Sequence, residues 1–344
     1  MKFKDLKYLA AFIAPVLAAV AIFKGGNWVW SVIVFAFVLV PILEQFLPQL
    51  SAEYEEEEKE ARLASFFFDL LLIINIPIIY GLLYMLGINL GAGIYSNTET
   101  VGLVISLGIV LGASGINVAH ELGHRGNKFY QFFAKVLLLP CLYIHFFIEH
   151  NRGHHMYVST PEDPASARRG EVVYFFFIRS IVKSYAHAWA LENKRLKGKW
   201  LSFSNKMIQF TLITAAYIAT LFLLFAPLAA TLLLVSGLIS ILLLETINYI
   251  EHYGLQRKKL ENGRYERVMP HHSWNSNHIM GRIILYELTR HSDHHFQSSK
   301  EYQILEHHPN SPQLPLGYPA SMLMALLPPV WFKVMDKRLP AAVV

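Results

Sequence analysis

Histidines are the residues of this sequence whose type and spacing predict chemistry. The 344-residue chain holds 16 of them, and most fall into four dense clusters: HELGHR, HNRGHH, NYIEHYG and HSDHH. Spacings of three or four residues place imidazole rings on one face of a helix, and imidazole is a ligand for zinc, copper, iron and nickel. The clusters therefore predict a metal site with nine candidate ligands: His120, His124, His150, His154, His155, His252, His291, His294 and His295.

The number of candidate ligands predicts two metal ions rather than one. An ion that keeps a coordination position open uses about three to five protein ligands, so a single ion would leave about half of the set unused. Imidazole alone does not select the metal. Soluble di-iron bundles combine glutamates with their histidines, so an all-histidine set is expected to leave the ions with more net positive charge.

Residues near the clusters are expected to orient the ligands, because a ligating imidazole usually donates its second N–H to a carboxylate or carbonyl. A carboxylate at such a place can also bind metal directly or simply end a helix. The candidate supporting residues are Glu121, Glu149, Asp163, Glu251 and Asp293, with His271, His272 and His278 of the loop PHHSWNSNH. The other four histidines, expected in packing, interfacial or surface-loop positions, are His145, His187, His307 and His308. No catalytic residue beyond the metal centre is assigned.

The chain that carries these clusters belongs in a lipid bilayer. Hydrophobic residues make up 54% of the chain, far more than a soluble domain of this length tolerates. A spanning helix needs about 20 mostly apolar residues. We predict six spans, none of them containing a histidine, near 8–24, 28–47, 66–90, 101–118, 206–226 and 228–250. The predicted fold is one all-α integral membrane domain over residues 1–344, with a helical cap that carries the polyhistidine site.

Basic residues predict the side of the membrane on which the site lies. Of the 30 lysines and arginines, all but Lys24 fall at the termini or in segments on one side of the predicted spans. Because basic segments stay in the cytoplasm, both termini and the metal site are predicted to be cytoplasmic. The formal charge of +5 is then explained by basic residues at the cytoplasmic lipid surface, and no nucleic-acid binding is expected.

Shorter features complete the predicted topology. Turns at 24–27 and around Pro227 are expected to pair the flanking spans antiparallel. Residues 130–148 are predicted to form a buried or interfacial helix under the membrane, and residues 172–190 an amphipathic helix at the interface. The helix that carries HSDHH is expected to begin near Gly281.

Two other classes of protein share parts of this pattern. HELGH matches HExxH, in which two histidines bind zinc and the glutamate is the general base of a protease, but an intramembrane protease of this kind would leave most of the clustered histidines unused. A metal transporter is expected to place polar ligands near the bilayer midplane, whereas these lie beyond the predicted spans. The lone Cys141 excludes a disulfide framework and an internal iron–thiolate carrier, so electrons for redox chemistry must come from outside.

HELGHR, EHNRGHH, NYIEHYGL and RHSDHH, in this order, resemble the membrane-bound alkane 1-monooxygenases, relatives of the membrane fatty acid desaturases and hydroxylases. NYIEHYGL, GRYE and PHHSWNSNH are the motifs specific to that family within the wider group. The resemblance covers essentially the whole chain, as far as LPLGYPASMLMALLP. A desaturase, or a hydroxylase of fatty acyl or alkyl-aromatic substrates, is the main alternative.

The resemblance implies a non-haem centre of two iron ions held by the nine histidines, and O2-dependent hydroxylation of the terminal methyl of an alkane taken from the bilayer. It also implies electrons from rubredoxin, reduced by an NAD(P)H-dependent reductase, and a location in the bacterial cytoplasmic (inner) membrane. In that family, the size of a side chain on a helix near the entrance of the substrate channel influences the preferred alkane chain length. The matching residue is Ala36, whose small side chain is expected to admit longer alkanes, unless it is an ordinary helix-packing residue.

Overall fold

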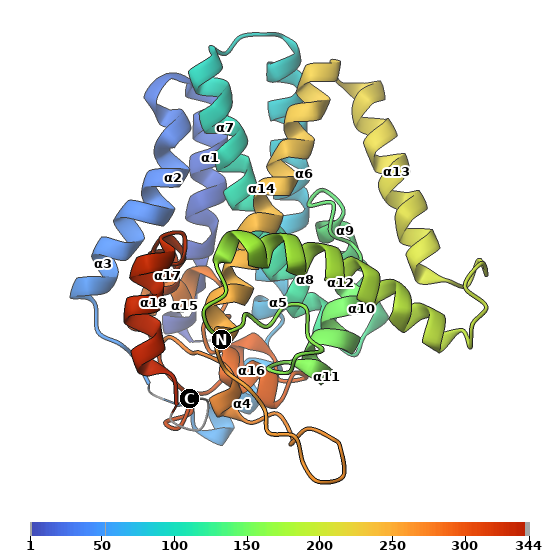
Figure 1. Cartoon of the computed structure of the whole chain (residues 1–344). Coiled ribbons are helices and arrows are strands. Elements are labelled where there is room, and N and C mark those ends of the chain that lie inside the picture. The colour runs from blue at the N-terminus through green and yellow to red at the C-terminus, as the bar shows by residue number, and fades with distance from the viewer. Residues whose placement is uncertain (1, 52, 341–344) are drawn as a thin grey trace.

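The computed structural model describes residues 2–51 and 53–340, and these residues are mostly helical (Figure 1). Six helices among them are long and apolar enough to cross a membrane: Phe3–Lys24, Gly26–Phe46, Phe66–Gly91, Asn97–His124, Lys206–Leu224 and Pro227–His252. The prediction of six spans is confirmed. The prediction that no histidine lies within a span is wrong for His120, His124 and His252, because two spans continue as unbroken helix into the site.

Each span is built from one to four helical elements. They are, in chain order, a 3-10 helix (Phe3–Phe12) with α1 (Ile13–Lys24); a 3-10 helix (Gly26–Trp30) with α2 (Ser31–Val34), a π-helix (Phe35–Leu39) and α3 (Val40–Phe46); α5 (Phe66–Ile73) with α6 (Asn75–Gly91); α7 (Asn97–Val110) with a π-helix (Leu111–Ile116) and α8 (Asn117–His124); α13 (Lys206–Leu224); and α14 (Pro227–His252). The remaining helices are α4 (Glu56–Leu63), α9 (Lys128–Leu138), α10 (Phe146–Glu149), α11 (His155–Tyr157), α12 (Val173–Arg195), α15 (Ile279–Ile284), α16 (His291–Phe296), α17 (Tyr318–Ala325) and α18 (Pro328–Met335). The histidine-bearing α11 and α16 lie at the end of the bundle where both chain termini lie, and so does α10, which directly precedes His150 (Figure 1).

Turn and cap residues fix the connections between the spans. Gly25 and Gly26, with φ of +59° and +54°, reverse the chain after α1, a conformation that glycine adopts without a steric clash. Ser96 and Glu99 form a capping box at the start of α7, and Glu99 also accepts a hydrogen bond from the Gly26 backbone N–H at 2.5 Å. Pro227 begins α14, where its missing N–H has no helical partner to lose. The spans joined at these turns run antiparallel, as predicted (Figure 1).

Two predicted helices are broken in the structure. Residues 130–148 do not form one helix, since α9 ends at Leu138 and α10 begins at Phe146, and the connection contains Leu142 at φ +58°. The helix expected to run from Gly281 through HSDHH is divided into α15 and α16, because Tyr286 and Glu287 adopt positive φ angles that no α-helix contains.

The amphipathic helix predicted over residues 172–190 is present as α12. It lies across the direction of the spans (Figure 1). Its exposed large hydrophobic residues recur at helical spacing and therefore share one side: Tyr174, Phe175, Ile178, Val182 and Tyr185. Such a face suits the boundary between lipid and water.

Three stretches of π-helix interrupt the α-helices, at Phe35–Leu39, Leu111–Ile116 and His150–His154. A π-turn bonds residue i to i+5 instead of i+4, so each stretch rotates the side chains that follow around the helix axis. Such stretches are frequent at functional sites. All three border the site described below.

A buried cluster of charged groups joins the first span to the segment before α16. The Arg62 guanidinium of α4, which is 3% exposed, pairs with the carboxylate of Asp5. Tyr8 Oη donates to Glu287 Oε1 at 2.7 Å, and Arg282 Nε donates to Glu287 Oε2 at 2.6 Å. Because buried charges are stable only when they are paired, these contacts fix the polypeptide that leads into the HSDHH cluster.

Candidate metal centre

The nine predicted ligands converge in two groups, within each of which one ring nitrogen per histidine lies within 4.8 Å of all the others. The five-histidine group consists of His120, His124, His150, His155 and His294. The four-histidine group consists of His154, His252, His291 and His295. The groups adjoin, since the rings of His155 and His295 stack with centroids 4.4 Å apart.

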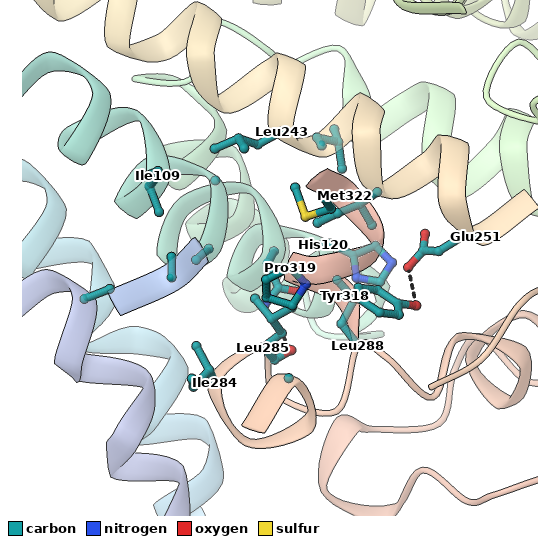
Figure 2. A pocket seen from close by; sticks show the side chains of 18 of the residues that line it. Ile109, His120, Leu243, Glu251, Ile284, Leu285, Leu288, Tyr318, Pro319 and Met322 are labelled. Carbon is teal, nitrogen blue, oxygen red and sulfur yellow. Dashed lines mark hydrogen bonds between the residues drawn. The ribbon is translucent and has the colours of Figure 1, made fainter. Parts of the chain in front are cut away.

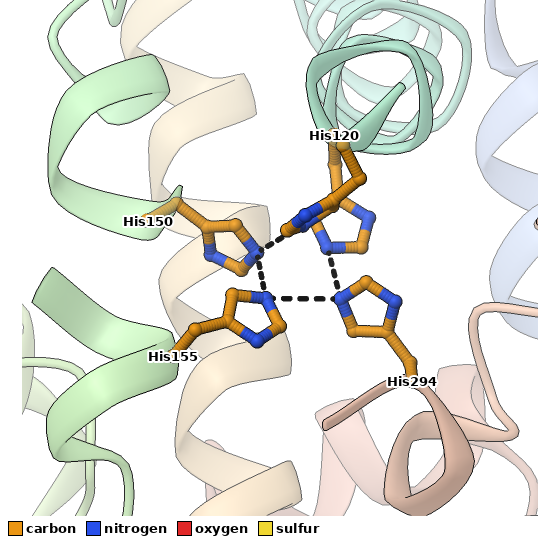
Figure 3. Close-up of side chains that lie close together, drawn as sticks. His120, His150, His155 and His294 are labelled. Carbon is orange, nitrogen blue, oxygen red and sulfur yellow. Dashed lines mark hydrogen bonds between the residues drawn. The ribbon is translucent and has the colours of Figure 1, made fainter. Parts of the chain in front are cut away.

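The spacing of the nitrogens in the five-histidine group fits one metal ion. The Nε2 atom of His294 lies 2.9 Å from that of His120 and 3.1 Å from that of His155, which in turn lies 3.0 Å from Nε2 of His150 (Figure 3). Ligand nitrogens at about 2.1 Å from an ion are about 3 Å apart when they subtend a right angle. The observed separations agree with that value.

The four-histidine group has the same spacing. Nε2 of His252 lies 3.1 Å from Nε2 of His291, and Nε2 of His154 lies 3.2 Å from Nε2 of His295. Several imidazole nitrogens that face one another in a buried space have no good hydrogen-bonding solution without a cation, because each neutral ring carries only one N–H. The donor set therefore fits one ion in each group.

The π-helical stretch His150–His154 explains how one short segment serves both groups. In an α-helix, His150 and His154 would lie above one another on the same face. The wider π-turn instead brings His150 and His155 into the five-histidine group and directs His154 into the other. On α16, the i, i+4 pair His291 and His295 points into the four-histidine group.

Burial keeps most ligands in the neutral form that binds metal. Desolvation, followed by the neighbouring imidazoles, lowers the pKa well below the ordinary value for five ligands outside the spans: His150, His155, His291, His294 and His295. At His154, desolvation is again the largest influence and lowers the pKa, but contact with Asp163 and other carboxylates outweighs it and raises the pKa.

Two of the predicted supporting carboxylates contact ligands, and both contact the four-histidine group. Asp163 Oδ2 lies 2.9 Å from Nδ1 of His154, the nitrogen that faces away from the metal position. Glu251 Oε2 lies 3.1 Å from Nε2 of His291, on the metal side of that ring. The other carboxylate oxygen of Glu251 accepts a hydrogen bond from Tyr318 Oη at 2.9 Å (Figure 2).

The other three predicted carboxylates pair with groups outside the ligand set. Glu121 lies 3.0 Å from Arg125 Nη2. Glu149 Oε1 lies 3.1 Å from His187 Nδ1, and Asp293 Oδ1 lies 2.7 Å from His308 Nε2. His187 and His308, for which the sequence predicts packing or surface positions, thus hold carboxylates next to the ligands in place.

The histidines of the loop PHHSWNSNH lie outside both groups. His272 Nε2 lies 3.3 Å from Glu266 Oε1, and its ring packs against that of His271 with centroids 4.2 Å apart. His278 Nδ1 lies 3.0 Å from the hydroxyl of Ser276. The structure shows no contact between these three side chains and a ligand among the described residues, so any support they give passes through the loop.

An apolar cavity of about 110 Å³ lies against the metal-binding groups (Figure 2). His120, His150 and His291 line it, and most other wall residues are aliphatic or aromatic. All three π-helical stretches contribute to the wall, and Ala36 is one of the residues they supply. An apolar molecule bound there would touch histidines of both groups.

Tyr318, which was not predicted from the sequence to be a site residue, lines the cavity and donates a hydrogen bond to Glu251. Its segment, LPLGYPAS, carries no charge or histidine and reads as an ordinary turn before an apolar helix. Pro319 at the start of α17 was the available signal for a fixed helix start, but it says nothing of what the neighbouring tyrosine contacts.

Known proteins are similar to this chain over most of its length. The fatty acid desaturase family profile matches residues 98–322. The chain is 39% identical over 319 residues to alkane 1-monooxygenase 2 of Pseudomonas aeruginosa, with 91% of this chain and 85% of the relative covered. It is 38% identical to an alkane 1-monooxygenase of Ectopseudomonas oleovorans, with 97% and 85% covered.

A more distant relative has another printed substrate. The hydroxylase component of the xylene/toluene monooxygenase of Pseudomonas putida is 28% identical over 338 residues, with 96% of this chain and 88% of the relative covered. The match to the alkane enzymes is higher in identity over a similar share of the chain. By these similarities, and with the nine clustered histidines in place, the chain belongs to the membrane-bound alkane 1-monooxygenases of the fatty acid desaturase family.

Proposed function

We propose that this protein hydroxylates alkanes at a terminal methyl group, in an O2-dependent reaction at a non-haem di-iron centre that yields a primary alcohol. The five-histidine group would hold one iron and the four-histidine group the other. Residues 1–344 would act as one membrane-embedded domain. Both termini and the metal centre would lie on the cytoplasmic side of the bacterial inner membrane, as the distribution of basic residues favours.

The observation that carries this proposal is the contact between the apolar cavity and both histidine groups. An alkane has no hydrogen-bonding atoms, so a protein can bind it only by apolar surface and shape. The cavity offers such a surface and has ligand histidines in its wall. A zinc protease would instead need a polar cleft for a peptide backbone.

When bound, two irons supply the activation of O2, one atom of which enters a C–H bond while the other leaves as water after uptake of two electrons and two protons. The residues of this chain determine which carbon reacts. Aliphatic and aromatic side chains of the wall exclude water and hold the alkane. A narrow cavity presents the chain end to the centre, a positioning effect that favours one carbon over its chemically similar neighbours.

The electrons are proposed to come from rubredoxin, reduced by an NAD(P)H-dependent reductase. The sequence contains a single cysteine, the buried Cys141, whereas iron–sulfur carriers need about four cysteine ligands. The chain therefore offers no such carrier of its own. The metal centre lies at the end of the bundle where both chain termini lie (Figure 1), and a soluble carrier would approach it from that end.

The test combines metal content with product analysis. The purified chain in detergent is expected to bind about two irons and, with rubredoxin, its reductase, NADH and O2, to convert an n-alkane to the 1-alcohol detected by gas chromatography. His291→Ala is expected to abolish the product. One zinc and no oxygenated product would overturn the proposal. Two irons with an alkene or a hydroxylated acid as product would keep the metal centre and change the reaction.

A second candidate reaction is hydroxylation of a methyl group on an aromatic ring, which the 28% identity to the xylene/toluene monooxygenase component favours. Both reactions break a C–H bond of a methyl group, so the metal centre does not separate them. Competition between p-xylene and n-octane in one vessel does: the proposed function expects mainly 1-octanol, and the second candidate expects mainly the benzylic alcohol.

A further inference from the structure

A second apolar cavity, of about 300 Å³, lies between α12, α13 and the turn that precedes α10. Figure 1 shows α13 standing apart from most of the bundle, and it is the least buried of the six spans, with 17% of its apolar window buried. His145 and Tyr185 line one side of this cavity, and Thr214 and Ala215 of α13 line the other. Ala215 is exposed, so the cavity opens to the lipid that surrounds a spanning helix.

A small polar cavity separates this α12–α13 cavity from the metal centre. Its volume of about 10 Å³ leaves room for about one water molecule. It shares His145 with the α12–α13 cavity, and it shares Phe146 and the ligand His150 with the cavity of the metal centre. Three cavities thus follow one another from the metal centre to the lipid, on the side of α12 and α13.

His145 is the polar group at the inner end of the α12–α13 cavity. Its side chain is 7% exposed, and its Nε2 atom has no hydrogen-bond partner among the described residues. Its ring is held edge-on by Tyr143 and Tyr185, with centroids 4.4 and 5.0 Å away. Burial lowers its pKa to about 4, so the ring is neutral at pH 7 and offers one N–H donor and one acceptor nitrogen.

A buried imidazole that lines an apolar cavity and has an unpartnered nitrogen indicates the kind of molecule that completes the site, because buried polar groups are normally hydrogen-bonded. A hydroxyl group is both donor and acceptor, like the neutral imidazole. An alkane has neither, and the ester carbonyls of a phospholipid only accept. Most of the residues that line the cavity are apolar, which suits an alkyl chain.

We propose that the α12–α13 cavity binds a straight-chain primary alcohol, with its hydroxyl group on His145 and its alkyl chain along α13. The inference rests on the proposed function in one respect: it takes a primary alcohol to be the product that forms at the metal centre, on the other side of the small polar cavity. The site then prefers product over substrate by one hydrogen bond. It gives the alcohol a place near the lipid surface that does not compete with the alkane for the cavity of the metal centre.

Photolabelling tests the site without turnover. A primary alcohol with a diazirine on its alkyl chain is added to the purified iron-loaded chain without reductant, irradiated, and the labelled peptides are identified by mass spectrometry. Labels are expected on α13 and on residues 142–145, with displacement by 1-dodecanol and none by dodecane. Equal displacement by the two, labels confined to the cavity of the metal centre, or displacement only by phospholipid would overturn the proposal.

Two variants, Ala215→Trp and His145→Phe, separate the site from general partition into detergent. Ala215→Trp fills the cavity from α13 and is expected to abolish the labels. Ala216→Trp, at an exposed neighbouring position outside the cavity wall, is expected to leave them. His145→Phe is expected to weaken labelling about three- to tenfold, the range for one lost hydrogen bond, with iron content as the check on folding. Unchanged labelling in both Ala215→Trp and His145→Phe would overturn the proposal.

The same preparations are assayed for alcohol formation from an alkane. Product formation without labels in the α12–α13 cavity would refute the alcohol site and leave the proposed function standing. Labels that behave as expected in a protein that oxidises no alkane would refute the proposed function and leave the binding site.

Discussion

Removal of the Asp163 carboxylate is expected to weaken the metal site of the four-histidine group and to spare the other. Asp163 Oδ2 accepts hydrogen bonds from His154 Nδ1 at 2.9 Å and from Ser166 Oγ at 2.6 Å, and it is buried. Hydrogen bonds to a charged partner contribute about 1.5–3 kcal/mol and neutral ones about 0.5–1.5 kcal/mol. Asp163→Asn keeps an acceptor and loses the charge, so we expect a cost of about 1 kcal/mol, about fivefold in metal affinity. Asp163→Ala also removes the acceptor, and the expected loss is about 10- to 100-fold.

The assay is iron retention by the purified protein against increasing concentrations of a competing chelator, read together with alcohol formation. With one iron in each group, as proposed above, the iron of the four-histidine group in Asp163→Ala is expected to leave at about 10- to 100-fold less chelator, while the other leaves as in the unmodified protein. Glu162→Gln is the matched control, because its exposed carboxylate contacts Tyr265 Oη at 3.2 Å and no ligand. Loss of both irons together, or unchanged retention in Asp163→Ala, would refute the assignment of Asp163 to one group.

Three further predictions address the cavity, the fold and the effect of pH. Ala36→Trp is expected to shift turnover from long to medium-chain alkanes, because the indole would fill part of the cavity that Ala36 lines. Val38→Trp, at an exposed position of the same helix, is the control and should cause no shift. An unchanged product profile in Ala36→Trp would show that Ala36 does not belong to the substrate site. Arg62→Met is expected to lower the free energy of unfolding by about 3–5 kcal/mol, because it leaves Asp5 buried without its partner, and a melting temperature within one degree of the unmodified protein would contradict this. In the metal-free protein, the five ligands whose pKa is lowered stay neutral in the folded state, while the unfolded chain takes up protons below its histidine pKa of about 6.5. The folded state therefore loses stability as the pH falls below that value. His154, with a raised pKa, acts in the opposite sense. Thermal unfolding at a lower temperature at pH 5 than at pH 7.5 is expected, and the reverse order would contradict it.

The features that could be predicted from the sequence are those that depend on residues close to one another along the chain. Six apolar segments predicted six spans, and the turns at Gly25 and Pro227 predicted their antiparallel pairing, because length, hydropathy and turn chemistry are local properties. The nine ligands were identifiable because they cluster along the chain, and the structure brings all nine into two compact groups. Asp163 was a candidate only by its nearness in sequence to His154, and its contact with that ring was not deducible.

The breaks within helices were not predictable. Periodicity arguments assume one uniform turn, so the π-helical stretches and the positive φ angles of Tyr286 and Glu287 lie outside what a hydrophobic pattern records. Tyr318 lies 67 residues from Glu251 in the sequence, and only the fold brings them together. Partner choice among buried polar groups is set in three dimensions, which is why His308 reaches Asp293 instead of lying free in a loop.

The two histidine groups are chemically unequal, and the inequality originates in the π-helical stretch His150–His154. By placing His154 apart from His150 and His155, the stretch produces a division of four and five ligands. Asp163 and Glu251 both contact the four-histidine group, whereas no described carboxylate lies within 4.0 Å of a ring nitrogen of the five-histidine group. An ion held by the smaller group would therefore have fewer imidazoles and more negative charge nearby, which would favour a higher oxidation state there than in the larger group. The cavity wall includes histidines of both groups, so an apolar chain end bound there would lie close to two metal-binding groups of different character.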